Sequence, residues 1–254
     1  MSALAADPSG GRLGIDLPRG HIVPDTAGAP ALWLSDGHVD GHGLAALHAQ
    51  APRLGLRPVL LNLEGFVQPV EPDRPEHPFE PDEVLARWTA RRPGPAPGHE
   101  FDGCETCEAA AGIPRSLPGA SFAAERDRDP AETAAAVAHG QLAHAPYLGL
   151  VAAARSADIL TALSWDGPAN RGEEIGRYAA VLGRWEECWG ARVVALSGAF
   201  LVCSAARPPR TMDQAVELAL EHQAFCPDYA GPGEPISRYA ASLLDASVWT
   251  FWWD

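Results

Sequence analysis

The sequence predicts an α+β protein in which residues 147–254 form a ferredoxin-like domain, with a central antiparallel hairpin and helices on one face. Strand-like and helix-like segments alternate there in the order β-α-α-β-β-α-α-β, with clear stop signals between them. Only Ser197-Gly198 separates the two central strand-like runs, a spacing typical of a tight hairpin. Eighteen of the 24 prolines precede Tyr147, whereas six of the eight tryptophans follow it. We therefore expect two regions, residues 1–146 and residues 147–254.

The N-terminal region is predicted to be a smaller, proline-rich α/β unit. Apolar runs bounded by turn signals predict strands at 31–34 and 57–61, with a short helix at 44–50 between them. A helix is expected at 81–91, because proline is tolerated in the first helical turn, and an alanine-rich helix should open at Asp129-Pro130. Residues 92–120 are so rich in proline and glycine that we expect a long loop.

Helix stop and start signals define the elements of the C-terminal region. Ser156 and Thr211 are expected to cap helices, Gly190 to end one, and Pro227 to end another. Thr211 and Gln214 together have the spacing of a capping box. The last strand is apolar on both faces, so we expect it to be buried. The predicted helices are 156–163, 173–189, 211–226 and 236–244, and the predicted strands are 147–151, 192–196, 199–203 and 248–253.

A short pattern occurs in both regions. Gly55-Leu-Arg57 and Gly190-Ala-Arg192 each lead into an apolar strand. The pattern fits two related halves, but shared turn chemistry in two similar units is the simpler interpretation, because few connections join such elements.

Composition and charge exclude several classes of protein. The 254 residues contain no lysine, which removes Schiff-base, pyridoxal phosphate and P-loop chemistry. The net charge of −14 disfavours nucleic acid as a partner. No segment approaches the roughly 20 apolar residues of a membrane span, and no secretory leader is apparent, so we expect a cytoplasmic protein without a membrane partner.

His222 and Cys226 are four residues apart and lie on one face of a predicted helix. An imidazole and a thiol one turn apart can share a zinc ion or form a nucleophile pair. The stripe that they continue is apolar, however, and a helix C-terminus does not lower the pKa of a thiol. We therefore favour a core role for both residues over a metal site.

Cys104 and Cys107 form the Cys-x-x-Cys pair of the chain. This spacing suits zinc or a redox pair, but the motif lies in the expected proline-rich loop rather than at a strand-to-helix junction. Reduced, exposed thiols are the simpler interpretation. Together with His222 and Cys226, the pair would complete a four-ligand zinc site, although the sequence does not show that they meet.

Aromatic residues of the C-terminal region are candidates for a ligand pocket or a partner surface. On helices, tryptophans at such spacings more often lie in the core. The candidates are Trp165, Trp185, Trp249 and Trp252, together with the acidic residue Asp228.

Several motifs of the C-terminal region occur together as a set. They are Trp165-Asp-Gly-Pro168, Gly190-Ala-Arg-Val-Val194, Pro208-Pro-Arg-Thr211, Glu221-His-Gln-Ala-Phe-Cys-Pro-Asp228 and Trp249-Thr-Phe-Trp-Trp-Asp254. Through this set, residues 147–254 resemble a bacterial family, common in actinomycetes, whose shared domain has no known function. Residues 1–146 look like the variable N-terminal part of the same proteins. The resemblance implies no activity, cofactor or catalytic residue.

These observations favour a non-catalytic protein-binding module. Its acidic surface would suit a basic partner, in the manner of an immunity protein, and no complete catalytic template is present. Two alternatives stay open. One is a zinc protein or metal-dependent enzyme that uses Cys104, Cys107, His222 and Cys226, and the other is a small-ligand sensor with a tryptophan-lined pocket. No cofactor is predicted under the favoured hypothesis.

Overall fold

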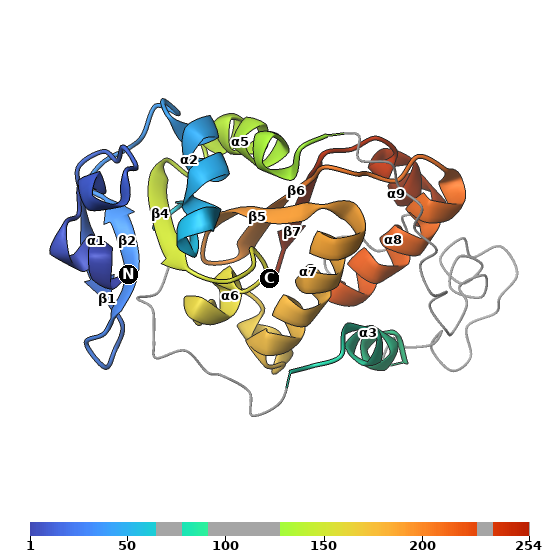
Figure 1. Ribbon diagram of the computed structural model, residues 1–254. Helices are drawn as coiled ribbons and strands as arrows, with labels where there is room; N and C mark the ends of the chain where they lie inside the picture. Colours follow the sequence, from blue (N-terminus) through green and yellow to red (C-terminus); the bar gives the residue numbers. More distant parts are fainter. Residues whose placement is uncertain (65–77, 91–127, 228–235, 254) are drawn as a thin grey trace, which may run out of the picture.

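A seven-stranded mixed sheet forms the centre of the protein in the computed structural model, which describes residues 1–64, 78–90, 128–227 and 236–253 (Figure 1). The strand order is β1-β2-β4-β3-β5-β6-β7. All neighbouring strands are antiparallel except β3 and β5, which are parallel. The strands are β1 (Gly20–Pro24), β2 (Pro30–Ser35), β3 (Leu56–Leu61), β4 (Tyr147–Ala152), β5 (Ala191–Leu196), β6 (Phe200–Ala205) and β7 (Val248–Trp252).

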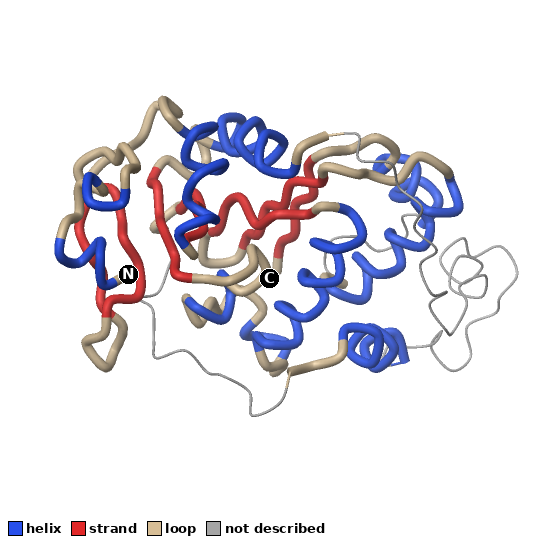
Figure 2. The backbone as a smooth tube through the Cα atoms, in the orientation of Figure 1, coloured by secondary structure: helices blue, strands red, loops and turns tan. Residues whose placement is uncertain are grey.

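Helices cover both faces of this sheet (Figure 2). One face packs against α1 (Ser2–Ala6), α2 (Leu44–Gln50) and α5 (Pro130–Gln141). The other face packs against α3 (Pro81–Ala90), α6 (Ile159–Ala162), α7 (Ile175–Trp189), α8 (Met212–Phe225) and α9 (Ile236–Leu243). The described part of the chain therefore has three layers and two hydrophobic cores.

The α+β class is confirmed, and the elements of residues 147–254 follow the expected β-α-α-β-β-α-α-β order. Their four helices lie on one face. The ferredoxin-like topology is not confirmed, because β3 from the N-terminal region lies between β4 and β5. In addition, each helix pair joins antiparallel strands rather than parallel ones. The division into two domains at residue 147 stays a prediction.

Several local predictions correspond closely to the structure. Asp129 caps α5 by accepting hydrogen bonds from the first helical N–H groups, and Gly190 ends α7 in the left-handed region at φ 62°. Thr211 Oγ1 accepts from the Gln214 N–H group at 3.3 Å. The Gln214 side chain instead accepts from the N–H group of Arg210, so the capping box is shifted by one residue from its usual partner.

Two local predictions are wrong. The α6 helix begins after Asp158, and Ser156 does not cap it. The closing strand β7 is an edge strand of the sheet, and its residues Val248 and Trp252 are 42% and 37% exposed. Its apolar sequence therefore does not reflect burial on both faces.

Among the described residues, no helix combines the length and the apolar character that crossing a bilayer requires.

Candidate functional site

His222 lies on α8 and is enclosed in the core by side chains of α7, α9 and β7. Its side chain is fully buried, and its ring centroid lies 4.7–4.9 Å from the ring centroids of Trp185, Trp249 and Phe251. Nδ1 lies 2.7 Å from the hydroxyl of Tyr239, and no described residue forms a hydrogen bond with Nε2. Burial lowers the pKa of His222 to about 3, so the imidazole is neutral at pH 7.

Cys226 follows the last residue of α8 and is also fully buried. Its thiol donates a hydrogen bond to the carbonyl oxygen of Trp252 on β7, at 2.9 Å. His222 and Cys226 thus connect α8 to α9 and to β7, which is the core role favoured by the sequence. Neither side chain reaches solvent, so neither is placed to react with a dissolved substrate.

Glu221 completes this set of contacts on α8. The residue is 5% exposed, and its two carboxylate oxygens accept from Arg184 at 3.2 Å and from Trp185 Nε1 at 2.7 Å. Arg184 also pairs with Asp82 of α3 at 2.8 Å. Burial raises the pKa of the Glu221 carboxyl, and Arg184 and Trp185 oppose this rise. The contacts of Glu221 therefore link α8 to α7, and Arg184 extends them to α3.

The candidate tryptophans have different environments. Trp165, Trp185 and Trp249 are buried, and Trp165 Nε1 donates to the Ser197 carbonyl at 2.7 Å. Trp252 is exposed on the edge strand. None of the four lines the pocket described below.

The remaining candidates, Cys104, Cys107 and Asp228, lie outside the described residues. Within the described ranges, no group of three or more histidine, cysteine, aspartate or glutamate side chains is arranged to hold a metal ion. The four-ligand zinc site therefore stays a prediction.

A pocket of about 310 Å³ lies where the parallel strands β3 and β5 diverge. The two strands pair at Leu60–Ala195 and Leu61–Leu196, near their C-terminal ends. Arg57 and Arg192 each lie three residues before the first of these pairs in the sequence, and the pairing of β5 with β6 shifts register between Val193 and Ala195. The residues that line the pocket are His48, Ala49, Pro52, Arg53, Arg57, Pro58, Asp129, Pro130, Ala131, Ala134, Ser156, Arg192 and Val193.

Local chemistry explains why the strands separate at this point. Pro58 has no N–H group to donate to a neighbouring strand. Val193 on β5 donates its N–H group to Ser156 Oγ at 2.7 Å instead of to β3. The hydroxyl predicted to cap a helix therefore replaces a strand partner, and the gap between the strands becomes the pocket.

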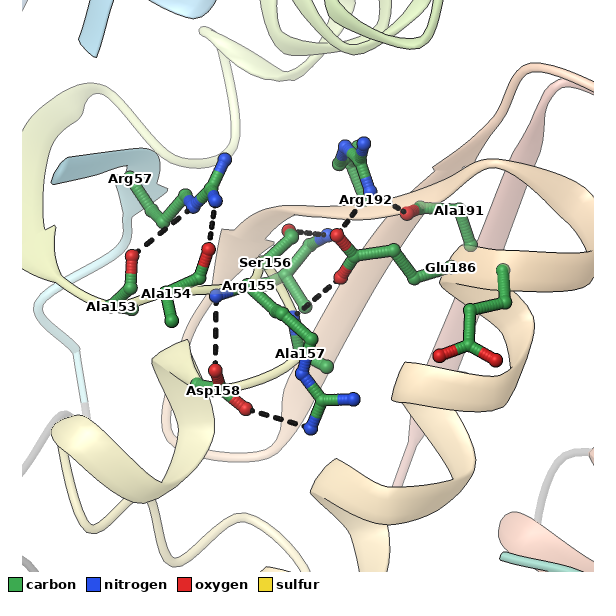
Figure 3. A network of polar contacts seen from close by, with 12 residues as sticks. Arg57, Ala153, Ala154, Arg155, Ser156, Ala157, Asp158, Glu186, Ala191 and Arg192 are labelled. Atoms are coloured by element: carbon green, nitrogen blue, oxygen red, sulfur yellow. Dashed lines mark hydrogen bonds and ion pairs between the residues drawn. The ribbon is translucent and has the colours of Figure 1, made fainter. Parts of the chain in front are cut away.

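Each of the two strand arginines is anchored on one side (Figure 3). Arg57 donates through Nε to the Ala153 carbonyl at 3.3 Å, and through Nη2 to the Ala154 carbonyl. Arg192 pairs through Nη1 with Glu186 and donates to the Ala191 carbonyl. Both side chains lie on the same side of the 153–158 segment in Figure 3. These contacts fix the two guanidinium groups at the pocket in advance of any ligand.

Positive charge dominates the pocket. Burial lowers the pKa of Arg57, and repulsion from Arg192 lowers it further, against the attraction of Glu186 and Asp158. Arg53 adds a third cation, and it is exposed. His48 adds none at pH 7, because burial lowers its pKa to about 4. An anion bound here would relieve the repulsion between the arginines.

Sequence reasoning did not select these residues as a site. A signal was present in the Gly-x-Arg pattern, since Gly55 and Gly190 both adopt positive φ and each precedes the strand that carries a pocket arginine. The sequence did not show that the two strands are neighbours. Without that information, Arg57 and Arg192 are two unrelated surface cations.

Comparison with known proteins matches only the part of the chain that follows residue 146. No curated protein and no solved structure matches the chain. The pocket receives residues from both sides of position 147, since Ser156, Arg192 and Val193 follow it and the other lining residues precede it. Residues 147–254 match the family described as a domain of unknown function, DUF4253.

Proposed function

We propose that the protein binds a small anionic ligand in the arginine pocket between β3 and β5. The observation that carries this proposal is the convergence of Arg53, Arg57 and Arg192 on one pocket of a chain whose net charge is −14. An acidic protein gains no solubility from gathering cations in a cavity, and guanidinium groups are well suited to carboxylates and phosphates. The volume of about 310 Å³ falls at the lower end of the roughly 300–1,000 Å³ typical of small-molecule pockets.

This proposal is a form of the small-ligand sensor hypothesis, but the residues that line the pocket differ from those expected. Arginine, serine and small apolar residues surround the pocket, in place of the tryptophans expected from the sequence. Anchoring of Arg57 by Ala153 and Ala154 supports binding, because side chains held in place lose little conformational entropy when the ligand arrives.

Titration calorimetry at constant ionic strength tests the proposal. The probes are acetate, propionate, sulfate, inorganic phosphate and a set of small amino acids, with chloride as the reference anion. Arg53→Gln removes an exposed cation of the pocket, and Arg87→Gln removes an exposed cation from α3, outside the pocket. We expect Arg53→Gln to weaken binding by about tenfold, in line with the loss of one charge-assisted hydrogen bond, and Arg87→Gln to leave it unchanged. Equal effects of the two variants, or no saturable binding of any probe, would contradict the proposal.

The protein-binding hypothesis stays a separate proposal, supported by the net charge of −14. It predicts that a basic protein partner binds more weakly as salt concentration rises, because salt screens the acidic surface. The zinc hypothesis also stays a proposal. Elemental analysis of untagged protein tests it, with loss of stoichiometric zinc expected when Cys104 and Cys107 are both changed to serine.

A further inference from the structure

We infer that the ligand of the arginine pocket is a small zwitterion of the α-amino acid type, with its carboxylate toward the arginines and its ammonium group toward Asp129. This inference rests on the proposed function, because it assigns the chemical class of the anion. Four features of the pocket support it.

The α5 helix does not offer a phosphate site. Phosphate groups at helix N-termini are usually held by the unpaired N–H groups of the first turn. At the N-cap of α5, Asp129 Oδ1 already accepts from the N–H groups of Ala131 and Glu132, at 2.8 and 3.1 Å, and Pro130 has no N–H group. The carboxylate of Asp129 also adds a negative charge that would repel a dianion more strongly than a carboxylate.

The strand side of the pocket suits a carboxylate. No described residue accepts a hydrogen bond from Nη1 of Arg57 or from Nε and Nη2 of Arg192. The hydroxyl of Ser156 accepts from Val193 and keeps its own hydrogen for donation. These donors match the several lone pairs of a planar carboxylate.

The helix side of the pocket suits a positively charged donor. Asp129 is exposed, and no described residue donates to its Oδ2 atom. The imidazole of His48 is neutral at pH 7, because its pKa is lowered to about 4, and it does not repel an ammonium group. The charged residues that line the pocket together with His48 are Asp129 at the N-cap of α5, Arg53, Arg57 of β3 and Arg192 of β5.

The rest of the lining is small and apolar. A pocket of about 310 Å³ with such walls accommodates a short aliphatic side chain without a large rearrangement. The apolar residues of the lining are Ala49, Pro52, Pro58, Pro130, Ala131, Ala134 and Val193.

Calorimetry with the full chain and matched probes tests the ligand class. The probes are glycine, L-alanine, L-valine and L-leucine, together with 3-methylbutanoate, isobutylamine and inorganic phosphate. 3-Methylbutanoate is valine without its amino group, and isobutylamine is valine without its carboxylate. We expect at least one amino acid to bind about tenfold more tightly than 3-methylbutanoate, and isobutylamine to show no binding.

Two variants identify the group that recognises the ammonium. Asp129→Asn keeps a good N-cap for α5 but removes the charge, and Asp16→Asn is a control at an exposed aspartate outside the pocket. We expect Asp129→Asn to abolish the preference for the amino acid over 3-methylbutanoate, and Asp16→Asn to preserve it.

The outcomes separate the two proposals. Phosphate or 3-methylbutanoate binding more tightly than every amino acid, with weaker binding in Arg53→Gln, would overturn the ligand class and leave the proposed function standing. The ligand class is also overturned, and the proposed function retained, if Asp129→Asn weakens all carboxylates equally. Failure of every probe to bind would overturn both proposals.

Discussion

Replacing His222 with phenylalanine is expected to make the stability of the protein less sensitive to acid. The imidazole is fully buried, and burial lowers its pKa from 6.5 to about 3. The unfolded chain therefore binds a proton at this residue before the folded chain does. Stability is unaffected by the titration of His222 above pH 6.5 and falls as the pH decreases below that value.

The expected loss follows from the size of this difference. Between pH 6.5 and pH 4.5 the folded imidazole stays neutral, so His222 costs about 1.4 kcal/mol per pH unit, or about 2.7 kcal/mol in total. Carboxylates and His48 also titrate below pH 6.5, but they are present in both proteins. Their contributions cancel when the variant is compared with the unchanged protein.

Urea denaturation at several values of pH between 7 and 4.5 measures the effect. As the pH decreases, the free energy of unfolding of the unchanged protein should fall more steeply than that of His222→Phe. The difference between the two proteins should change by about 2.7 kcal/mol in favour of the variant. Tyr239→Phe is the matched control, because it removes the hydroxyl 2.7 Å from Nδ1 but keeps the titrating ring. We expect its pH dependence to parallel that of the unchanged protein.

Parallel curves for the unchanged protein and His222→Phe would refute this reasoning. They would mean that the imidazole accepts a proton in the folded state as readily as in the unfolded state. The aromatic enclosure by Trp185, Trp249 and Phe251 would then not exclude water from the ring.

Three further predictions concern the same core. Glu221→Gln should lower the free energy of unfolding by about 1–3 kcal/mol in urea denaturation, because it removes the charge that pairs with Arg184; unchanged stability would mean that the pair contributes nothing. Gly190→Ala should cost about 1 kcal/mol in the same assay, because φ is 62° and the added Cβ would lie 3.1 Å from the Cβ of Ala206; a stabilised variant would contradict the strain. In a Cys104→Ser/Cys107→Ser background, Cys203 and Cys226 should react with a thiol reagent only after unfolding, as followed by mass spectrometry, since both are fully buried; labelling of the folded protein at either residue would show that the core opens.

Local signals predicted most of the helices and strands. The Ser197-Gly198 turn, the Asp129 cap and the Gly190 stop each act within a few residues, so they can be recognised in the sequence. The predicted helix at 44–50 has the same bounds as α2. No such signal predicts the strand β1 (Gly20–Pro24), because its flanking glycines and prolines resemble those of a loop.

Long-range pairing was not predictable in the same way. Periodicity gives the faces of a strand but not its neighbours, so the place of β3 between β4 and β5 could not be derived. The exposure of Trp252 could not be predicted for the same reason, because the sequence of an apolar edge strand resembles that of a central strand. The pocket depends on this pairing, and the sequence showed only the two Gly-x-Arg motifs that contain its strand arginines.

The position of β3 has a consequence for the family to which residues 147–254 are matched. Both neighbours of β4, the strands β2 and β3, come from outside this segment. A shorter chain with only these residues would have an unpaired strand β4 and a three-stranded sheet β5-β6-β7 with an unprotected edge at β5, and such edges favour aggregation. In this protein, the sheet strands of residues 147–254 are therefore joined into one sheet only through β3, which lies outside the matched segment.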